Sequence, residues 1–170
     1  MTDEPFLETQ ESRGPSEEAP SIEDRIGRLV REQPYAILCT QGEGQPYGSL
    51  VAIATTDDLA SMVFATPRAT RKYRLLMECD HVAVVIDSRS RKCHDMMEIE
   101  ACTVTGRVTE LVDADELSRF SELLLARHSQ LKEFLASPST ALFRVDVVRY
   151  FHVSRFQEVR QWAPPSGSSR

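Results

Sequence analysis

Four basic side chains fall within seven consecutive residues of the segment FATPRATRKYRLL (64–76), in a sequence whose acids outnumber its bases. They are Arg68, Arg71, Lys72 and Arg74. An apolar run ends just before them, and a helix is predicted to begin near Thr70. A helical turn would bring Arg68, Arg71 and Lys72 to one side, because residues three and four positions apart share a helix face.

Cations in this arrangement are suited to binding a phosphate dianion. An arginine can hold phosphate oxygens with two parallel hydrogen bonds, and a lysine acts as a point charge. Thr66 and Thr70 add hydroxyl donors, while the helix start adds free backbone N–H groups and the positive end of its dipole. The alternative is an ordinary solvated face. Cations at a helix N-terminus oppose the dipole, however, and this opposition favours a bound anion.

The elements that must position this cluster are mostly strands. Apolar or alternating runs predict strands at 35–40, 46–55, 60–66, 81–87, 98–112, 142–152 and 156–162. The segment QGEGQ (41–45) supplies a glycine turn between the first two strands, and Gly106 predicts a bulge or bend in the long fifth strand. Short loops between consecutive strands indicate antiparallel pairing, and the first three are expected to form a meander.

Helices are expected around these strands at about 21–34, 70–79 and 113–127. Ser21 and Asp113 are typical helix N-caps, since each is followed three residues later by an acid. The loop 88–96 is polar and basic and is expected to be mobile. The sequence therefore predicts a mainly β protein, a closed or nearly closed antiparallel barrel of six or seven strands with peripheral helices.

The chain of 170 residues has the size and ordinary composition of one globular domain, expected over 21–162. Its net charge of −6 is concentrated in 1–20, where six acids face one arginine. That segment and 163–170 have few large apolar residues and are expected to be disordered. The acidic balance disfavours a general nucleic-acid binder. No apolar run approaches a membrane span and no secretory signal is recognisable, so a cytoplasmic location without a membrane partner is expected.

Metal and disulfide chemistry is not expected. The four cysteines show no C-x-x-C spacing, and two lie in apolar strand-like runs, which indicates buried reduced thiols. Cys93, His94 and Asp95 are adjacent in the basic loop, but neighbouring side chains point apart and make a poor ligand set. No Ser-His-Asp or Cys-His pattern can be inferred, so no catalytic residue is assigned.

The sequence resembles the pyridoxamine 5′-phosphate oxidase-like family of FMN-binding split barrels. The resemblance rests on YAILCTQGEGQPYGSLVAIA, MVFATPRATRKYRLL and HVAVVI, and more loosely on TVTGRVTEL, which together cover roughly residues 22–112. No single piece is specific, but their order and spacing are. The resemblance implies a six-stranded antiparallel split barrel of the FMN-binding type, and a homodimer with FMN at the subunit interface.

The resemblance also implies how the FMN phosphate would be held. Lys72 and Arg71 would bind it as cations, and Thr70 and Thr66 would donate hydrogen bonds to it. This agrees with the phosphate chemistry of the residues themselves.

Four further residues are placed beside the isoalloxazine ring by the resemblance. Ser49, Leu50 and Val51 on the second strand would run along the ring and offer backbone groups to its edge. For Leu50 and Val51 the alternative is a place in the barrel core. Trp162 would cover the ring from the partner subunit, and its alternative is surface or dimer packing.

Several positions depart from the pyridoxamine-phosphate oxidases themselves. Those enzymes have an arginine in place of Ser49 and a glutamine in place of Ala101, and they end with an Arg-x-His substrate motif that is missing here. Leu123 stands where they hold the substrate phosphate with basic and hydroxyl side chains. Oxidation of vitamin B6 is therefore not expected. The resemblance implies a shorter flavin-binding relative, a flavin-dependent oxidoreductase with an unidentified small-molecule substrate.

Two alternatives stay open. The domain could bind flavin or haem without turnover, for storage, sensing or regulation, and a haem protein would bring His94 or His152 forward as candidates. It could also bind the deazaflavin F420, which would use the same phosphate site. The lack of a catalytic triad does not decide between them, because a flavin performs its own redox step and needs only positioning and electrostatics from the protein.

Overall fold

A computed structural model describes residues 20–90, 95–155 and 157–165. The N-terminal segment 1–19, the loop residues 91–94 and the C-terminal residues 166–170 lie outside the described residues, so the expected disorder of the two tails stays a prediction. The loop 88–96 is described only at 88–90 and 95–96, so its expected mobility also stays a prediction. Within the described part of the chain, no helix is long and apolar enough to cross a membrane.

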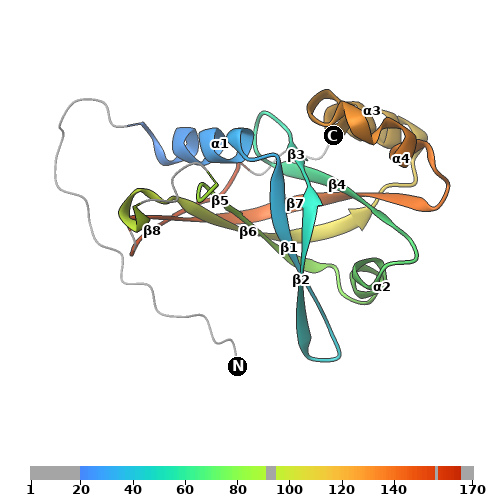
Figure 1. The fold of residues 1–170 in the computed structure, drawn as a ribbon, viewed down its shortest axis with the longest axis horizontal. Helices are drawn as coiled ribbons and strands as arrows, with labels where there is room; N and C mark the ends of the chain where they lie inside the picture. The colour runs from blue at the N-terminus through green and yellow to red at the C-terminus, as the bar shows by residue number, and fades with distance from the viewer. Residues whose placement is uncertain (1–19, 91–94, 156, 166–170) are drawn as a thin grey trace.

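The described residues form one antiparallel sheet of eight strands, ordered β2-β1-β5-β6-β7-β4-β3, with β8 paired to β7 (Figure 1). The strands are β1 (Tyr35–Gly42), β2 (Gln45–Ala52), β3 (Ala54–Thr55), β4 (Ser61–Pro67), β5 (His81–Asp87), β6 (Ala101–Glu110), β7 (Thr140–Ser154) and β8 (Glu158–Trp162). Each predicted strand has a counterpart in this sheet.

The sheet curls back on itself through a single residue. Its order begins with β2 and ends with β3, yet only Ile53 separates these two strands along the chain. The first part of the returning strand therefore pairs with β1, and its last two residues pair with β4. The predicted mainly β, split-barrel class is confirmed, although the strand count differs from six because the returning strand is divided and β8 is added.

Helices cover the sheet at three places. They are α1 (Ile22–Glu32), α2 (Arg71–Glu78), α3 (Ala114–Arg127) and α4 (Lys132–Ala136), with short 3₁₀ turns at Met96–Glu98 and Ser129–Leu131. Ser21 caps α1 in a capping box, and the Asp113 carboxylate accepts two backbone N–H groups at the start of α3. Both predicted caps are confirmed. The sequence did not predict α4, which has only five residues and no side-chain cap.

Two apolar clusters hold these layers together. The larger one fills the curled sheet and is closed at one end by Ile26, Leu29 and Val30 of α1. The smaller one lies between the sheet and α3, where Phe120 and Leu124 are buried. Burial of each such side chain contributes about 1.5–3 kcal/mol. In Figure 1, α1 and β8 lie at one end of the molecule and α2 at the other.

A bulge in the pairing of β6 with β7 changes which residues of β7 face the interior. Thr105 pairs with Arg149 and Gly106 with Val147, so Val148 is the extra residue. Before Val148 the odd-numbered Ala141, Phe143 and Val145 face the larger cluster, and after it the even-numbered Tyr150, His152 and Ser154 are the buried residues. A Cβ on Gly106 would lie 2.6 Å from the Asp146 carbonyl oxygen. The predicted irregularity at Gly106 is confirmed, but its extra residue belongs to the neighbouring strand.

Candidate functional site

The start of α2 brings two threonines and the basic cluster together. Thr66 at the end of β4 is fully buried, and its hydroxyl lies 3.0 Å from the hydroxyl of Thr70. Thr70 is the N-cap of α2, since its hydroxyl accepts the backbone N–H of Tyr73 and donates to the carbonyl of Pro67. No acid occurs in the first turn of α2. The helix start thus combines free N–H groups with cations and lacks its own counter-charge.

Arg68 is separated from the other cations by a carboxylate. Its guanidinium lies 2.5 Å from Glu110 Oε1 and donates to the Tyr73 hydroxyl at 2.8 Å. The Tyr73 hydroxyl donates in turn to Glu110 Oε2, which closes a triangle between the start of α2 and the end of β6. Arg68 therefore precedes the helix and is neutralised there, and the sequence-based grouping of Arg68 with Arg71 and Lys72 is not what the structure shows.

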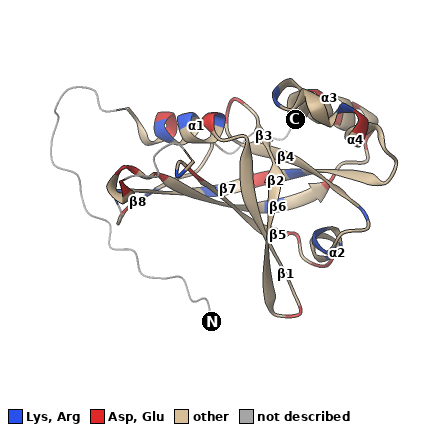
Figure 2. Cartoon of the chain, viewed as in Figure 1, with Lys and Arg blue, Asp and Glu red and all other residues tan. Residues whose placement is uncertain are grey.

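Arg71 and Lys72 remain without an acidic partner among the described residues. The guanidinium of Arg71 stacks on the ring of Tyr47, 5.1 Å from its centroid. Lys72 is partly buried, and burial alone holds the pKa of its ammonium below the ordinary value. A partly buried ammonium without a carboxylate is unfavourable, and it becomes favourable when an anion binds it. Figure 2 shows basic residues on α2, whereas α1 carries both signs of charge.

The hairpin of β1 and β2 supports α2 from one side. Its turn is at Glu43 and Gly44, which both have positive φ, as expected of the glycine turn in the sequence. A Cβ on Gly42 would lie 2.4 Å from Leu75 Cδ2, so the absence of a side chain there lets α2 pack against the hairpin. Stacking of Arg71 on Tyr47 joins the same two elements. The hairpin and the helix therefore hold the cluster in place together.

The three predicted ring residues on β2 face different ways. Val51 is buried in the core, and its neighbour Leu50 is 64% exposed on the opposite face. Ser49 shares the inner face with Val51, and its Oγ is buried without a hydrogen-bond partner among the described residues. In the described part of the chain β2 pairs only with β1, so every second residue of β2 directs its backbone N–H and C=O toward an edge that no described strand covers. These groups are free to receive a planar ligand.

Trp162 lies far from this cluster within the chain. It is the last residue of β8, pairs with Tyr150 and packs against its ring with 5.6 Å between centroids. In Figure 1, β8 and α2 are at opposite ends of the molecule. The structure thus gives Trp162 a packing contact inside its own chain, and a role over the ring of a second subunit stays a prediction.

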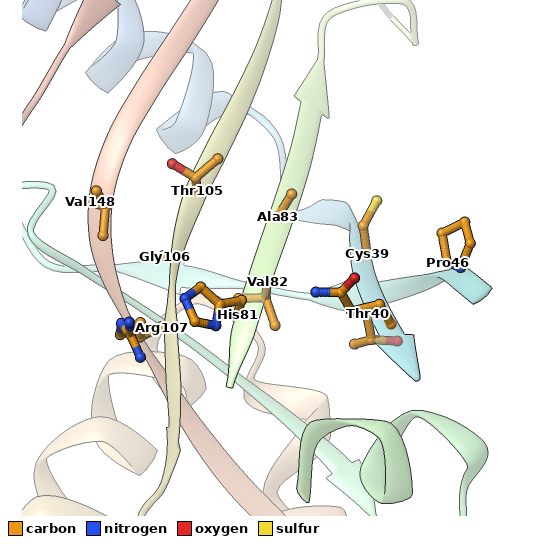
Figure 3. Close-up of a pocket in the computed structure, with 11 residues that line it drawn as sticks. Cys39, Thr40, Pro46, His81, Val82, Ala83, Thr105, Gly106, Arg107 and Val148 are labelled. Atoms are coloured by element: carbon orange, nitrogen blue, oxygen red, sulfur yellow. The ribbon is translucent and has the colours of Figure 1, made fainter. Parts of the chain in front are cut away.

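An open hollow of about 540 Å³ lies on the outer face of the sheet, on the other side of the hairpin (Figure 3). Cys39 and Pro46 form one wall, His81 and Ala83 the floor, and the bulge residue Val148 the far side. Arg107 and His81 at its lower end both contact Asp80, which accepts from Arg107 at 2.8 Å and lies 3.0 Å from His81. None of the predicted phosphate-binding residues lines this hollow.

Sequence reasoning missed three participants in the site. Tyr47, Tyr73 and Glu110 fix the orientations of the basic side chains, but they come from three separate elements. The tyrosine at the third position of α2 carried a usable signal, because it follows the two cations directly. Nothing in the sequence indicated that Glu110, 42 positions from Arg68, would neutralise it.

No metal site is evident in the described part of the chain, where no three His, Cys, Asp or Glu residues gather. Cys93 and His94 lie outside the described residues, so the triplet with Asp95 cannot be placed. His152 is fully buried under α1 and offers no exposed nitrogen to a haem. The three described cysteines Cys39, Cys79 and Cys102 are free thiols.

Comparison with solved structures identifies the fold. A haem-binding protein from Mycobacterium smegmatis superposes with a TM-score of 0.77 at 17% identity, over 86% of this chain and 59% of its own. Campylobacter jejuni ChuZ gives 0.73 at 8% identity, over 84% and 59%. A FAD-binding protein from Mesorhizobium loti gives 0.57 at 20% identity, over 74% and 88%. The chain thus spans less than two thirds of the first two relatives, and these low identities establish the fold alone.

At the sequence level, a search of curated proteins gave no significant match. The family model described as pyridoxamine 5′-phosphate oxidase matches residues 22–154. That match spans α1 and the strands β1 to β7, and it includes the hairpin, the end of β4 and the start of α2. The chain therefore belongs to the pyridoxamine 5′-phosphate oxidase family of split-barrel proteins.

Proposed function

We propose that this protein binds FMN and is a flavin-dependent oxidoreductase acting on a small molecule, as a homodimer. One observation carries the proposal. Lys72 is partly buried beside a helix start without acids, and no carboxylate of the described residues pairs with it. A phosphate dianion is the counter-charge that this arrangement fits, since lysine, arginine and free N–H groups all favour it.

Each residue of the cluster has a definable part in holding the phosphate. The partly buried ammonium of Lys72 supplies a charge-assisted hydrogen bond. Arg71 supplies a second cation, and stacking on the Tyr47 ring fixes the plane of its guanidinium. The Thr66 hydroxyl can turn its hydrogen from Thr70 to a phosphate oxygen. Arg68 takes no part, because Glu110 and Tyr73 hold it.

The free edge of β2 is where the ring of the flavin would lie. Backbone groups between Gly48 and Val51 can bond its polar edge, and Gly48 leaves the approach open, with only ordinary contact for an added Cβ. The buried Oγ of Ser49 adds a polar group without a partner in the described residues. A bound flavin supplies hydride and electron transfer, while the chain supplies binding and orientation.

A second copy of the chain would complete the site. The outer face of β2 carries the exposed Leu50, and Val148 at the far side of the hollow is 57% exposed. Apolar side chains around a hollow of this size favour burial against a partner. Sedimentation equilibrium tests this part directly. A dimer is expected at micromolar concentration, and a monomer that binds FMN fully would contradict it.

Absorption spectroscopy of the purified full chain tests the cofactor. Added FMN is expected to bind, with flavin bands that shift on binding and bleach with dithionite. A strong Soret band on addition of haem, without flavin uptake, would replace the proposal by the haem-binding alternative. Uptake of F420 in preference to FMN would keep the phosphate site and change the cofactor. Turnover with a nicotinamide donor then distinguishes an oxidoreductase from a storage or sensing module.

A further inference from the structure

A buried histidine lies beneath α1, at the end of the molecule away from α2. The side chain of His152 on β7 is fully buried, and neither ring nitrogen has a hydrogen-bond partner among the described residues. Two more buried polar atoms without partners belong to the same end: Oγ of Ser154, two residues along β7, and Nε2 of Gln33 at the C-cap of α1. Leaving such groups unpaired opposes burial by about 1–3 kcal/mol each.

The first half of α1 is tied to this region by one carboxylate. Glu100 accepts from Arg25 at 2.8 Å and from Arg28 at 3.1 Å, and its Oε2 lies 3.9 Å from Nε2 of His152. Glu100 is in turn fixed to the end of β5, since its backbone N–H donates to the Ser88 hydroxyl. Glu100 therefore lies between the arginines of the helix and the histidine beneath them.

The second half of α1 is held much more firmly. The Arg127 guanidinium donates to the carbonyls of Val30, Arg31 and Gln33 at 3.1, 2.7 and 2.6 Å. Leu29 and Val30 are buried in the core, and the chain continues directly into β1. Among the described residues, the first half has no such set of backbone hydrogen bonds from another element. It is held by the ion pairs of Arg25 and Arg28 with Glu100, and Ile26 is its one fully buried side chain before Gly27. The two halves of one helix thus differ in how strongly they are fastened.

We propose that the first half of α1, Ile22–Arg28, is a latch that opens on acidification and exposes His152 and the adjoining end of the barrel. The structure favours opening because the buried ring of His152, which has no hydrogen-bond partner among the described residues, gains water as a partner when the helix lifts. Glu100 and Ile26 keep the latch closed near neutral pH. Arg127 keeps the second half in place, so opening stays local.

The charges around His152 set the direction of the pH dependence. Burial lowers its pKa, Arg25 and Arg28 from α1 and Arg160 from β8 lower it further, and Glu100 opposes them only in part. The facing side chain on β6 is Cys102, whose thiol pKa burial raises to about 12, so it stays neutral. His152 therefore binds a proton less readily while covered than once exposed, and this difference favours the open state as pH falls.

Glu100 acts in the same direction at lower pH. Burial raises its pKa, but the hydrogen bond and charge of Arg25 and the charge of Arg28 outweigh burial and leave the pKa lowered. Its ion pairs are therefore complete above the pH range in which a glutamate ordinarily titrates. They are lost as pH falls through the pKa that Glu100 has in the folded protein. Acid thus protonates His152 below the helix and neutralises the Glu100 carboxylate that holds the helix in place.

Hydrogen exchange of the full chain, followed residue by residue by NMR, tests the latch. Exchange rates of the Arg25–Arg28 amides are corrected for intrinsic exchange and compared at pH 7.5 and 5.5. Uptake of one proton by an exposed histidine of ordinary pKa predicts an opening constant that is larger at pH 5.5, by up to about tenfold. The amides of Leu29–Glu32 and of α3 are expected to change much less. An unchanged constant, or an equal rise in all three segments, would overturn the proposal.

Two variants separate this histidine from general acid sensitivity. His152→Phe keeps an aromatic ring and removes the titrating nitrogens, so the rise in the opening constant at pH 5.5 is expected to disappear. His128→Phe is the matched control, because His128 is equally buried but lies beneath Tyr35 and bonds the Ile53 carbonyl at 3.0 Å. That variant is expected to keep the response. If neither variant folds, Glu100→Gln in the same assay is expected to raise opening at pH 7.5, and no rise would overturn the proposal.

Discussion

Replacing Lys72 with methionine separates its part in anion binding from its part in folding. Methionine keeps the unbranched stem and the helix propensity and removes the charge. The ammonium is partly buried, unpaired among the described residues, and has a lowered pKa through burial. In the protein without cofactor, Lys72→Met removes a poorly solvated charge. Its unfolding temperature is therefore expected to stay equal or rise.

The cofactor-bound protein is expected to respond in the opposite direction. A charge-assisted hydrogen bond contributes about 1.5–3 kcal/mol, so FMN affinity should fall roughly 10- to 150-fold. Riboflavin has the same ring without the phosphate, and its affinity should change less than about threefold, well under 1 kcal/mol. Fluorescence titration of both flavins gives the two ratios. The difference between them isolates the contribution of the phosphate.

Arg74→Met is the matched control for this experiment. Arg74 belongs to the same helix and carries the same charge, but its side chain is exposed. Exposed charges contribute little, so FMN affinity should fall by less than about threefold. If Arg74→Met weakens FMN as much as Lys72→Met does, or if riboflavin weakens in step with FMN, the phosphate does not lie against Lys72.

Other predictions concern the fold and its pH dependence. Gly106→Ala should destabilise the protein by about 1–3 kcal/mol, because the added Cβ would lie too close to a backbone oxygen. Gly48→Ala should have almost no effect on stability, and denaturant unfolding of the two variants gives the comparison. Arg127→Met should lower the denaturation midpoint, since three carbonyls at the end of α1 lose their donor. The free energy of unfolding should decrease as pH falls from 7 toward 4. Glu100→Gln should flatten that dependence, because the lowered pKa of Glu100 means that its stabilisation is present above the pH range in which a glutamate ordinarily titrates and is lost below it. A midpoint unmoved by Arg127→Met, or equal pH slopes with and without Glu100, would contradict these assignments.

The sequence predicted the elements well because their signals are local. Each of these signals affects only the few residues around it, and the structure confirms them: the capping residues Ser21 and Asp113, the hairpin glycines and the apolar runs. The curl of the sheet was less accessible. One residue, Ile53, decides that the returning strand leaves β1 and joins β4, and no local preference marks that change.

Prediction of the site was limited by contacts between distant segments. The sequence identified the threonines and cations at the start of α2, which the structure brings together. It could not show that Glu110 would pair with Arg68 and neutralise it, or that Tyr47 would orient Arg71, because both contacts depend on the register of the strands in the sheet. The burial of His152 was equally hidden, since the bulge at Val148 reverses which residues of β7 face inward.

The central claim is that a flavin phosphate binds at the start of α2, and competition by inorganic phosphate tests it most directly. FMN and riboflavin are titrated into the full chain at constant ionic strength, with and without added phosphate. FMN is expected to bind at least tenfold more tightly than riboflavin, and phosphate should weaken FMN alone. Equal affinities for the two flavins, unaffected by phosphate, would contradict the claim.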